Sequence, residues 1–282
     1  MVLSRIRQLK ISSIVFLFAL FVLWWFHDYI TKSNFSNGLF SYAYLYFLVA
    51  LVGGVNGLYV AYKWGWLSSY LGKIIAFFSF GLLAQVFGQL SYTYYYAILG
   101  VEVAPYPSIG DVGYFGSVLL YICGSLLLLK LLMSNSNKKS GRGDMYLVVL
   151  STLTMFLISY LFLLKGYAFD SSNILKGALD ISYPLFQSFY VSLAVASLFL
   201  LGSRLGGTGK RGILLLLIAL VIQYISDFTF LIKANNGTFY AGGPVDFLYL
   251  VAYFLMTVAI IELDLVFERL KNGKITNGGT VT

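Results

Sequence analysis

A short pattern of Ser or Gly, then Asp, then Tyr, each three residues apart, occurs three times along this chain, and a fourth copy carries serine in place of the aspartate. Residues three apart lie on one face of a helix, so each copy would present an acid and a phenol side by side. The acid or serine positions 41, 111, 180 and 246 are 70, 69 and 66 residues apart. The copies contain the pairs Ser41 and Tyr44, Asp111 and Tyr114, Asp180 and Tyr183, and Asp246 and Tyr249.

Two chemical roles fit this pattern. An acid three residues after a Ser or Gly at a helix start can accept hydrogen bonds from free backbone N–H groups, and it meets the positive end of the helix dipole. Alternatively, the acids and tyrosines line one outer cup that would take a cation or an amine through Coulomb attraction and cation–π contact. The first role predicts that Asp111, Asp180 and Asp246 each start a helix, and a capping acid can still face a cavity.

A second set of polar side chains lies inside apolar stretches. Asp227 has Gln223 one helical turn away, and Gln85 and Gln89 repeat this spacing in an earlier stretch. A charged Asp near the centre of a membrane helix costs roughly 2.5–3.5 kcal/mol, so such groups usually mark function. We predict that the two helices turn these faces inward as a polar seam, which either holds the bundle together by hydrogen bonds or couples to a proton or a ligand.

Residue types that most enzymes need are scarce. The chain has one histidine, His27, and one cysteine, Cys123, which excludes a histidine-built or cysteine-built metal site within the chain. The sequence has no Ser/His/Asp set and no phosphate-cradling glycine loop. We therefore expect a protein that is not an enzyme and that carries no cofactor and no metal.

The composition identifies the elements that must position these residues. Of the 282 residues, 59% are hydrophobic and only 11% are charged, and the mean hydropathy is +0.83, whereas a soluble domain carries about a quarter charged residues. Lipid offers the backbone no hydrogen-bond partner, so each long apolar stretch must be a helix. We predict an all-α polytopic membrane protein with one bundle over residues 1–268 and a disordered tail at 269–282. Its eight transmembrane helices are expected near 11–30, 41–62, 74–96, 112–132, 145–165, 179–201, 213–233 and 246–267.

Basic residues give the predicted orientation. With the N-terminus in the cytoplasm, all but four of the 19 Lys and Arg fall in cytoplasmic segments, as the positive-inside rule requires. We expect both termini on the cytoplasmic side of the plasma membrane, and the net charge of +8 is an orientation signal instead of a nucleic-acid-binding surface. Glycosylation sequons at Asn34 and Asn236 fall in predicted outer loops. Charged residues at the cytoplasmic end of the last helix are expected to form ion pairs: Glu262, Asp264, Glu268 and Arg269.

The even spacing of the acid and tyrosine pattern predicts an internal repeat. An interval of 66 to 70 residues accommodates one outward helix, an outer loop, one inward helix and an inner loop. The chain is therefore predicted to consist of four helical hairpins that repeat in the same orientation.

The segment "APYPSIGDVGYFGSVLLYICGSLLLL" (104–129) resembles the multi-helix membrane sensor regions that precede GGDEF, EAL, PAS or kinase domains in many bacterial and some archaeal signalling proteins. Those regions carry a P-[YF]-P-S-x-x-D-x-x-Y corner and later corners to which "LDISYPLFQSF" (179–189) and "GTFYAGGPVDFLY" (237–249) are similar. The resemblance spans residues 80–265 and implies a sensor architecture without naming a ligand. This chain shows only a short tail after the last helix, so sensing would need a separate partner protein.

Three functions remain open at this point. The first is a sensor or ligand-binding module that recognises a small ligand, a lipid or an ion and acts through a membrane or cytoplasmic partner protein. The second is an ion-coupled or proton-coupled transporter or channel that uses Asp227 and the glutamines, and the third is a structural subunit of a membrane complex. The resemblance favours the sensor.

Overall fold

The computed structural model describes residues 2–31, 41–101, 104–134, 142–169, 171–204 and 209–276. Within these ranges the chain forms helices and turns and no β-strand, so the predicted all-α class is confirmed. The helices are α1 (Val2–Thr31), α2 (Tyr42–Leu45), α3 (Leu48–Lys63), α4 (Tyr70–Thr93), α5 (Ile109–Ser134), α6 (Arg142–Ser159), α7 (Ile174–Arg204), α8 (Lys210–Asn235) and α9 (Pro244–Thr276), with a 3-10 turn η1 (Trp66–Ser68) and π-helical turns η2 (Tyr94–Ile98) and η3 (Tyr160–Leu164).

Eight helical stretches in the described ranges are long and apolar enough to cross a membrane. This number confirms the prediction and makes the chain a multi-pass membrane protein. The second stretch combines α2 and α3, and the third and fifth continue from α4 and α6 through their π-helical turns. The stretches are Leu9–Thr31, Tyr42–Lys63, Tyr70–Ile98, Ile109–Ser134, Gly143–Leu164, Ile174–Gly202, Lys210–Asn235 and Pro244–Lys271.

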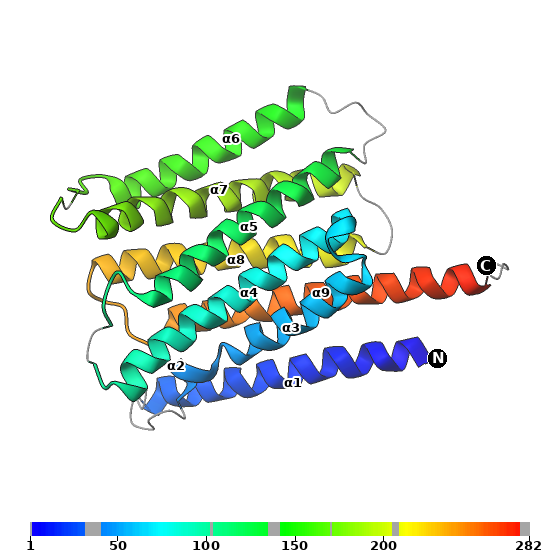
Figure 1. Cartoon of the computed structure of the whole chain (residues 1–282), viewed down its shortest axis with the longest axis horizontal. Coiled ribbons are helices and arrows are strands. Elements are labelled where there is room, and N and C mark those ends of the chain that lie inside the picture. The colour runs from blue at the N-terminus through cyan, green and yellow to red at the C-terminus, as the bar shows by residue number, and fades with distance from the viewer. Residues whose placement is uncertain are drawn as a thin grey trace.

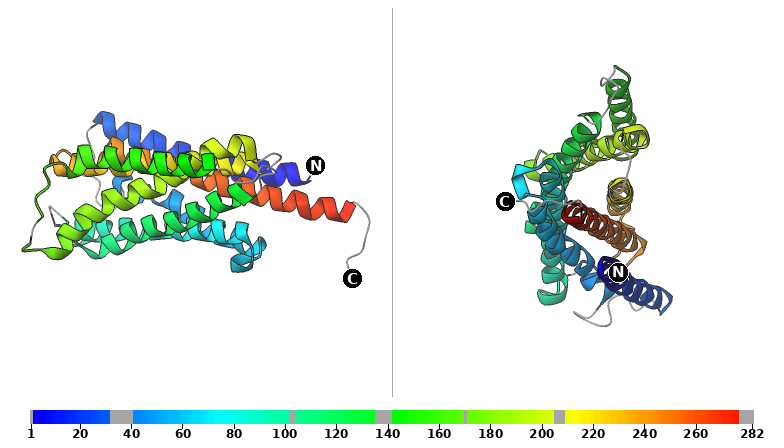
Figure 2. Two further views of the ribbon diagram at one scale, coloured as in Figure 1. Left: turned by 90° about the horizontal axis from the view of Figure 1, so that it is seen from above. Right: turned by 90° about the vertical axis from the view of Figure 1, so that its right-hand side faces the viewer.

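Six of the helices pack in a closed order in which each contacts the next. The order is α3, α4, α5, α7, α8 and α9, and α9 returns to α3; Figure 1 and the end-on view in Figure 2 show this arrangement. The other two long helices lie outside, with α1 against α9 and α6 against α7. Only 11% of the first membrane span and 6% of the fifth are buried, against at least 50% of every other span. The three corner aspartates, Asp227 and the glutamines at 85, 89 and 223 all belong to the six central helices.

Three of the four predicted helical hairpins consist of helices that pack against each other. α4 with α5, α6 with α7, and α8 with α9 are neighbours, whereas α1 lies chiefly against α9 and only slightly against α3. The fourfold hairpin repeat therefore stays a prediction.

Glycines allow α3 to approach two central helices closely. A Cβ atom on Gly53 would lie 2.1 Å from Thr257 Oγ1 on α9, and one on Gly57 would lie 2.1 Å from Ser79 Oγ on α4. Both distances are far below van der Waals contact, so no larger residue fits without a shift. The "GGVNG" stretch therefore serves as a close-packing face, which is the usual role of Gly-x-x-x-Gly in membrane helices.

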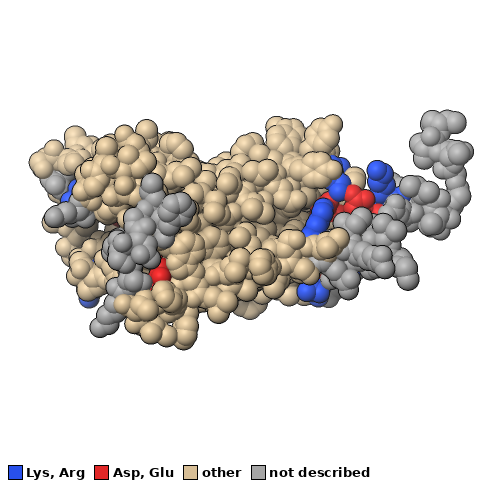
Figure 3. All heavy atoms as spheres, turned by 90° about the horizontal axis from the view of Figure 1, so that it is seen from below, with Lys and Arg blue, Asp and Glu red and all other residues tan. Residues whose placement is uncertain are grey.

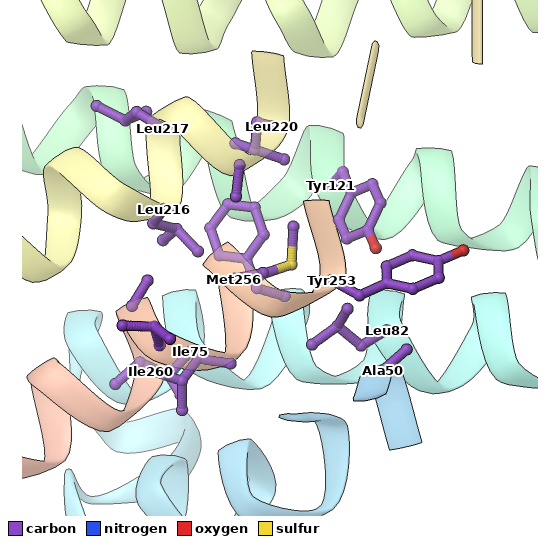
Figure 4. Packing of buried hydrophobic residues seen from close by; sticks show 14 of the residues in the cluster. Ala50, Ile75, Leu82, Tyr121, Leu216, Leu217, Leu220, Tyr253, Met256 and Ile260 are labelled. Atoms are coloured by element: carbon purple, nitrogen blue, oxygen red, sulfur yellow. The ribbon is translucent and has the colours of Figure 1, made fainter. Parts of the chain in front are cut away.

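Buried apolar side chains fill the space between the six central helices. Figure 4 shows Leu216 and Leu220 of α8, Met256 of α9 and Tyr121 of α5 in one apolar cluster, with Leu220 and Met256 nearest to Tyr121. All four side chains are at most 1% exposed. The two tyrosines in this view, Tyr121 and Tyr253, are thus polar groups set within an apolar core.

α1 begins and α9 ends at the same end of the bundle (Figure 1), which we call the termini end. We call the other end the corner end, because Asp111, Asp180 and Asp246 lie there. In Figure 3 the charged side chains gather at the two ends and leave an uncharged band between them. Such a band is what a membrane requires.

The ion pairs at the termini end join α9 to other helices. Asp264 lies 2.6 Å from Lys10 Nζ of α1 and 2.5 Å from Lys63 Nζ of α3, and Lys63 also contacts Glu268. Glu262 lies 3.6 Å from Arg211 Nε of α8. The charged residues at the end of the last helix thus tie three helices to it.

Candidate functional site

Two of the corner aspartates accept backbone hydrogen bonds at helix starts. Asp111 lies in the first turn of α5, and its Oδ2 accepts a bond from Ser108 N at 2.7 Å. Asp246 lies in the first turn of α9, and its Oδ2 accepts a bond from Gly242 N at 2.5 Å. These contacts are those of capping acids, which satisfy donors that a helix start leaves free.

Asp180 is held differently, and the expectation that it starts a helix is wrong. α7 begins at Ile174, and Asn173 Oδ1 accepts a bond from Lys176 N at 3.0 Å, so Asn173 occupies the capping position. Asp180 therefore lies in the second turn, where backbone N–H groups are already bonded within the helix. Its carboxylate accepts one hydrogen bond from Tyr106 and one from Tyr167, each at 2.8 Å.

Burial and the hydrogen bond to Asp180 act on Tyr106 outside the membrane spans. Burial is the larger effect, and together they raise the pKa of the Tyr106 hydroxyl above its usual range. Tyr106 therefore stays protonated and keeps donating to Asp180 at any neutral pH.

Three of the four tyrosines of the repeated pattern, Tyr114, Tyr183 and Tyr249, point into the bundle. Each donates a 2.9 Å hydrogen bond to a polar group of a neighbouring helix: Tyr114 to Gln89 Oε1, Tyr183 to Asp111 Oδ1 and Tyr249 to Asp227 Oδ1. Asp111 and Asp246 are only 7% and 5% exposed. These acids and phenols are therefore engaged with one another inside the protein instead of facing an open cup.

The glutamines of α4 bond to the central helices α5 and α9 and to the short helix α2 with its C-cap. Gln89 accepts hydrogen bonds from Tyr46 (3.2 Å) and Tyr114 (2.9 Å) and donates to Ala43 O (2.9 Å). Gln85 donates to Ser117 Oγ of α5 at 2.7 Å and accepts a bond from Tyr253 of α9 at 3.1 Å.

The polar seam is continuous through α9. Tyr249 donates to Asp227 on α8, and Tyr253, one turn further along α9, donates to Gln85 on α4. The two tyrosine rings are stacked at 6.1 Å. The seam expected between the helices of Gln85 and Asp227 thus forms with α9 as the intermediate helix.

Asp227 lies within the bundle, about 12 Å along the axis from the end of α8 at Asn235 at a rise of about 1.5 Å per residue. Its carboxylate is 5% exposed and accepts hydrogen bonds from Tyr190 (2.8 Å), Tyr249 (2.9 Å) and Gln223 (3.1 Å). Among the residues that the structure describes, all of these partners are neutral. A buried carboxylate without a cationic partner is costly, and Asp227 has neither a cation nor a backbone N–H group among the hydrogen-bond donors that the described residues provide to it.

Two polar atoms on residues that contact Asp227 or its donor Tyr190 are buried without a hydrogen-bond partner. They are the carbonyl oxygen Oε1 of Gln223 and the hydroxyl of Tyr121, on side chains that are 0% exposed. The Tyr121 ring packs edge-on against the Tyr190 ring at 5.9 Å. Such atoms are rare in folded proteins and call for an explanation.

Sequence reasoning missed several tyrosines of this network. Tyr46, Tyr121, Tyr190 and Tyr253 lie inside apolar stretches, and nothing in their local pattern separates them from the other tyrosines of the chain. One signal was present on α9, where Tyr249, Tyr253 and Thr257 follow one another at four-residue intervals and so form a polar stripe on a membrane helix.

The remaining predicted sites lie elsewhere or outside the described residues. Asn236 is exposed in the turn after α8 at the corner end, and Asn34 lies outside the described residues. Among the described residues there is no group of three or more His, Cys, Asp or Glu that could hold a metal ion.

Comparison with known proteins identifies no relative. No family model, no curated protein and no solved structure matches this chain significantly. Its function must therefore be argued from the site itself.

Proposed function

We propose that this multi-pass membrane protein is a sensor or ligand-binding module that acts through a partner protein, and that Asp227 is the group that responds to the stimulus. The observation that supports this proposal most is the set of donors to Asp227. One buried carboxylate holds side chains from α7, α8 and α9 together through neutral donors. Any event that changes the charge or the contacts of this carboxylate changes the hydrogen bonds of three helices.

The route to a partner follows α9. This helix runs without interruption from the corner end, where Tyr249 contacts Asp227, to Asp264 at the termini end. The two positions are about 22 Å apart at a rise of about 1.5 Å per residue. Asp264 in turn holds Lys10 of α1 and Lys63 of α3. A shift of α9 at Asp227 would therefore reach the face at which we place a cytoplasmic partner.

The sensor is favoured over a transporter because the helices around Asp227 are unbroken. α7, α8 and α9 each continue past the site as α-helices, whereas transporters commonly build their substrate sites from interrupted helices. The polar seam is also packed by tyrosine rings.

Hydrogen exchange of the full-length protein in lipid nanodiscs tests the coupling. The variant Asp227→Asn keeps the shape of the side chain and removes its charge. We expect it to change amide exchange of α9 near Asp264, on the far side of the bundle. Asp180→Asn is the matched control, because Asp180 bonds only loop and corner tyrosines, and it should leave that segment unchanged.

Affinity purification from the native membrane, followed by mass spectrometry, tests the partner. We expect a stoichiometric protein to co-purify with the wild type and its yield to change with Asp227→Asn but not with Asp180→Asn. Unchanged exchange near Asp264 together with an unchanged yield would contradict the proposal.

Ion-coupled or proton-coupled transport is the second candidate, and it is favoured by the same neutral surroundings of Asp227. Flux of ions or protons into proteoliposomes is the direct measurement. Flux that disappears in Asp227→Asn would favour transport over sensing.

A further inference from the structure

We propose that Asp227, Gln223 and Tyr121 form a binding site for a monovalent alkali cation, Na⁺ or K⁺, between α5, α7, α8 and α9. This cation would be the stimulus that the sensor detects, so the inference rests on that proposed function. Two observations support this cation site: the unpaired oxygen atoms around Asp227, and the negative charge of its carboxylate, which has no cationic partner among the described residues.

The oxygen atoms come from two helices, α8 with Asp227 and Gln223 and α5 with Tyr121. Gln223 Nε2 donates to Asp227 Oδ1 at 3.1 Å, and Oε1 of the same amide is buried without a partner. The Tyr121 hydroxyl is likewise buried without a partner, and Asp227 is the charged group whose field acts on it. Both free oxygens are thus next to the carboxylate or within its electrostatic reach.

The balance of charge favours a cation. The three donors to Asp227 are neutral, so the ionised carboxylate carries a full negative charge in the bundle interior. Carboxylate, amide carbonyl and phenol oxygens are hard ligands, which suit alkali and alkaline-earth ions. One negative charge balances a monovalent ion, whereas a divalent ion would leave a net positive charge buried.

A proton on Asp227 is the competing explanation for the buried carboxylate, and it leaves more polar atoms without a hydrogen-bond partner. The titratable groups that bond to Asp227 or lie within its electrostatic reach are Tyr190 of α7, Tyr249 and Tyr253 of α9 and Tyr121 of α5. If Asp227 were protonated and donated to Gln223 Oε1, the amide would have to turn, and its Nε2 would then lose its acceptor. The Tyr121 hydroxyl would still lack a partner. A proton only neutralises the charge of Asp227, whereas a cation neutralises this charge and also coordinates both free oxygens.

Thermal unfolding of the full-length protein in detergent tests the site. NaCl or KCl replaces choline chloride at constant ionic strength and constant pH, so that general screening stays the same. We expect the Tm to rise with Na⁺ or K⁺ and to saturate. Asp227→Asn should abolish this rise, and Tyr121→Phe should increase the half-saturating concentration about tenfold, the loss of one ligand worth about 1.4 kcal/mol.

Tyr183→Phe is the matched control, because it removes a buried phenol oxygen that donates to Asp111 instead. It should keep the wild-type response to the cation. If the Tyr121 hydroxyl does not coordinate a cation, Tyr121→Phe will raise the Tm equally in choline, Na⁺ and K⁺, since it removes an unpaired polar atom.

The wild-type series decides the question even if a variant does not fold. A wild-type Tm that is equal in choline, Na⁺ and K⁺ overturns the inference. If, in addition, a parallel series at several pH values changes the Tm, the site is assigned to a proton. Either result leaves the proposed sensor intact if Asp227→Asn still changes exchange near Asp264. Conversely, if the cation binds but Asp227→Asn leaves hydrogen exchange near Asp264 unchanged, the cation site is supported and the proposed sensor function is contradicted.

Discussion

Asp111 and Asp227 are both buried carboxylates of the same bundle, yet they are satisfied in opposite ways. Asp111 accepts a backbone hydrogen bond from Ser108, three residues earlier, and one further bond from Tyr183. Asp227 accepts only side-chain hydrogen bonds, two of them from other helices. A helix start leaves backbone N–H groups free for any suitably placed acid, whereas a helix interior leaves none. An acid in the interior therefore depends wholly on tertiary structure.

The largest expected effect separates the two acids directly. Asp227→Leu leaves three buried donors without an acceptor, each worth about 1–3 kcal/mol, partly offset by removal of the buried charge. We expect it to lower the free energy of unfolding by about 3 kcal/mol. Chemical unfolding in mixed micelles provides the measurement.

Asp111→Ala should have the next largest effect, because it removes a helix cap worth about 0.5–2 kcal/mol and an acceptor of Tyr183. Asp111→Asn should recover part of this loss, since the one amide oxygen can still accept the hydrogen bond from Ser108 N. If Asp111→Ala were more destabilising than Asp227→Leu in the same assay, the contrast between local and tertiary dependence would be wrong.

Removing one donor from each acid sharpens the comparison. Tyr190→Phe should destabilise the protein by about 1.5 kcal/mol, and Tyr183→Phe by about 0.5–1 kcal/mol, because Asp111 keeps its backbone donor whereas Asp227 has none. The two variants lose the same hydroxyl group, so each controls for the other. Equal losses would show that the backbone bond does not protect Asp111.

The smallest expected effect concerns alkaline pH and the corner end. Because the pKa of Tyr106 is raised in the folded state, the folded protein holds this proton at pH values where the unfolded chain has lost it. Stability therefore falls as pH rises above about 10, the usual pKa of tyrosine. Tyr106→Phe should make this fall less steep, as measured by Tm between neutral and alkaline pH. A steeper fall in the variant would contradict the expected sign.

Much of the fold could be predicted from the sequence. Length and apolarity located eight spans, because lipid leaves the backbone no alternative to a helix. Helix boundaries were less certain, and at α7 this mattered. The start at Ile174 instead of near 179 moved Asp180 from a capping position into the second helical turn.

The candidate site could be predicted only in part. Asp227 and the glutamines stood out because polar groups in apolar stretches are conspicuous. Their partners Tyr190 and Tyr253 did not, since a tyrosine in a membrane helix can equally face lipid or an interface.

The sequence by itself determined that this chain is an all-α membrane protein and that Asp111 and Asp246 lie where they can cap helices, because membrane insertion and capping depend on residues near one another in the chain. Only the tertiary structure decided that α1 and α6 lie outside, that α9 joins the two halves of the polar seam, and that Asp227 has neutral partners. These features depend on which helices become neighbours. That choice is made by packing of residues far apart in the sequence, such as the backbone of Gly53 against the side chain of Thr257, and no local pattern encodes it.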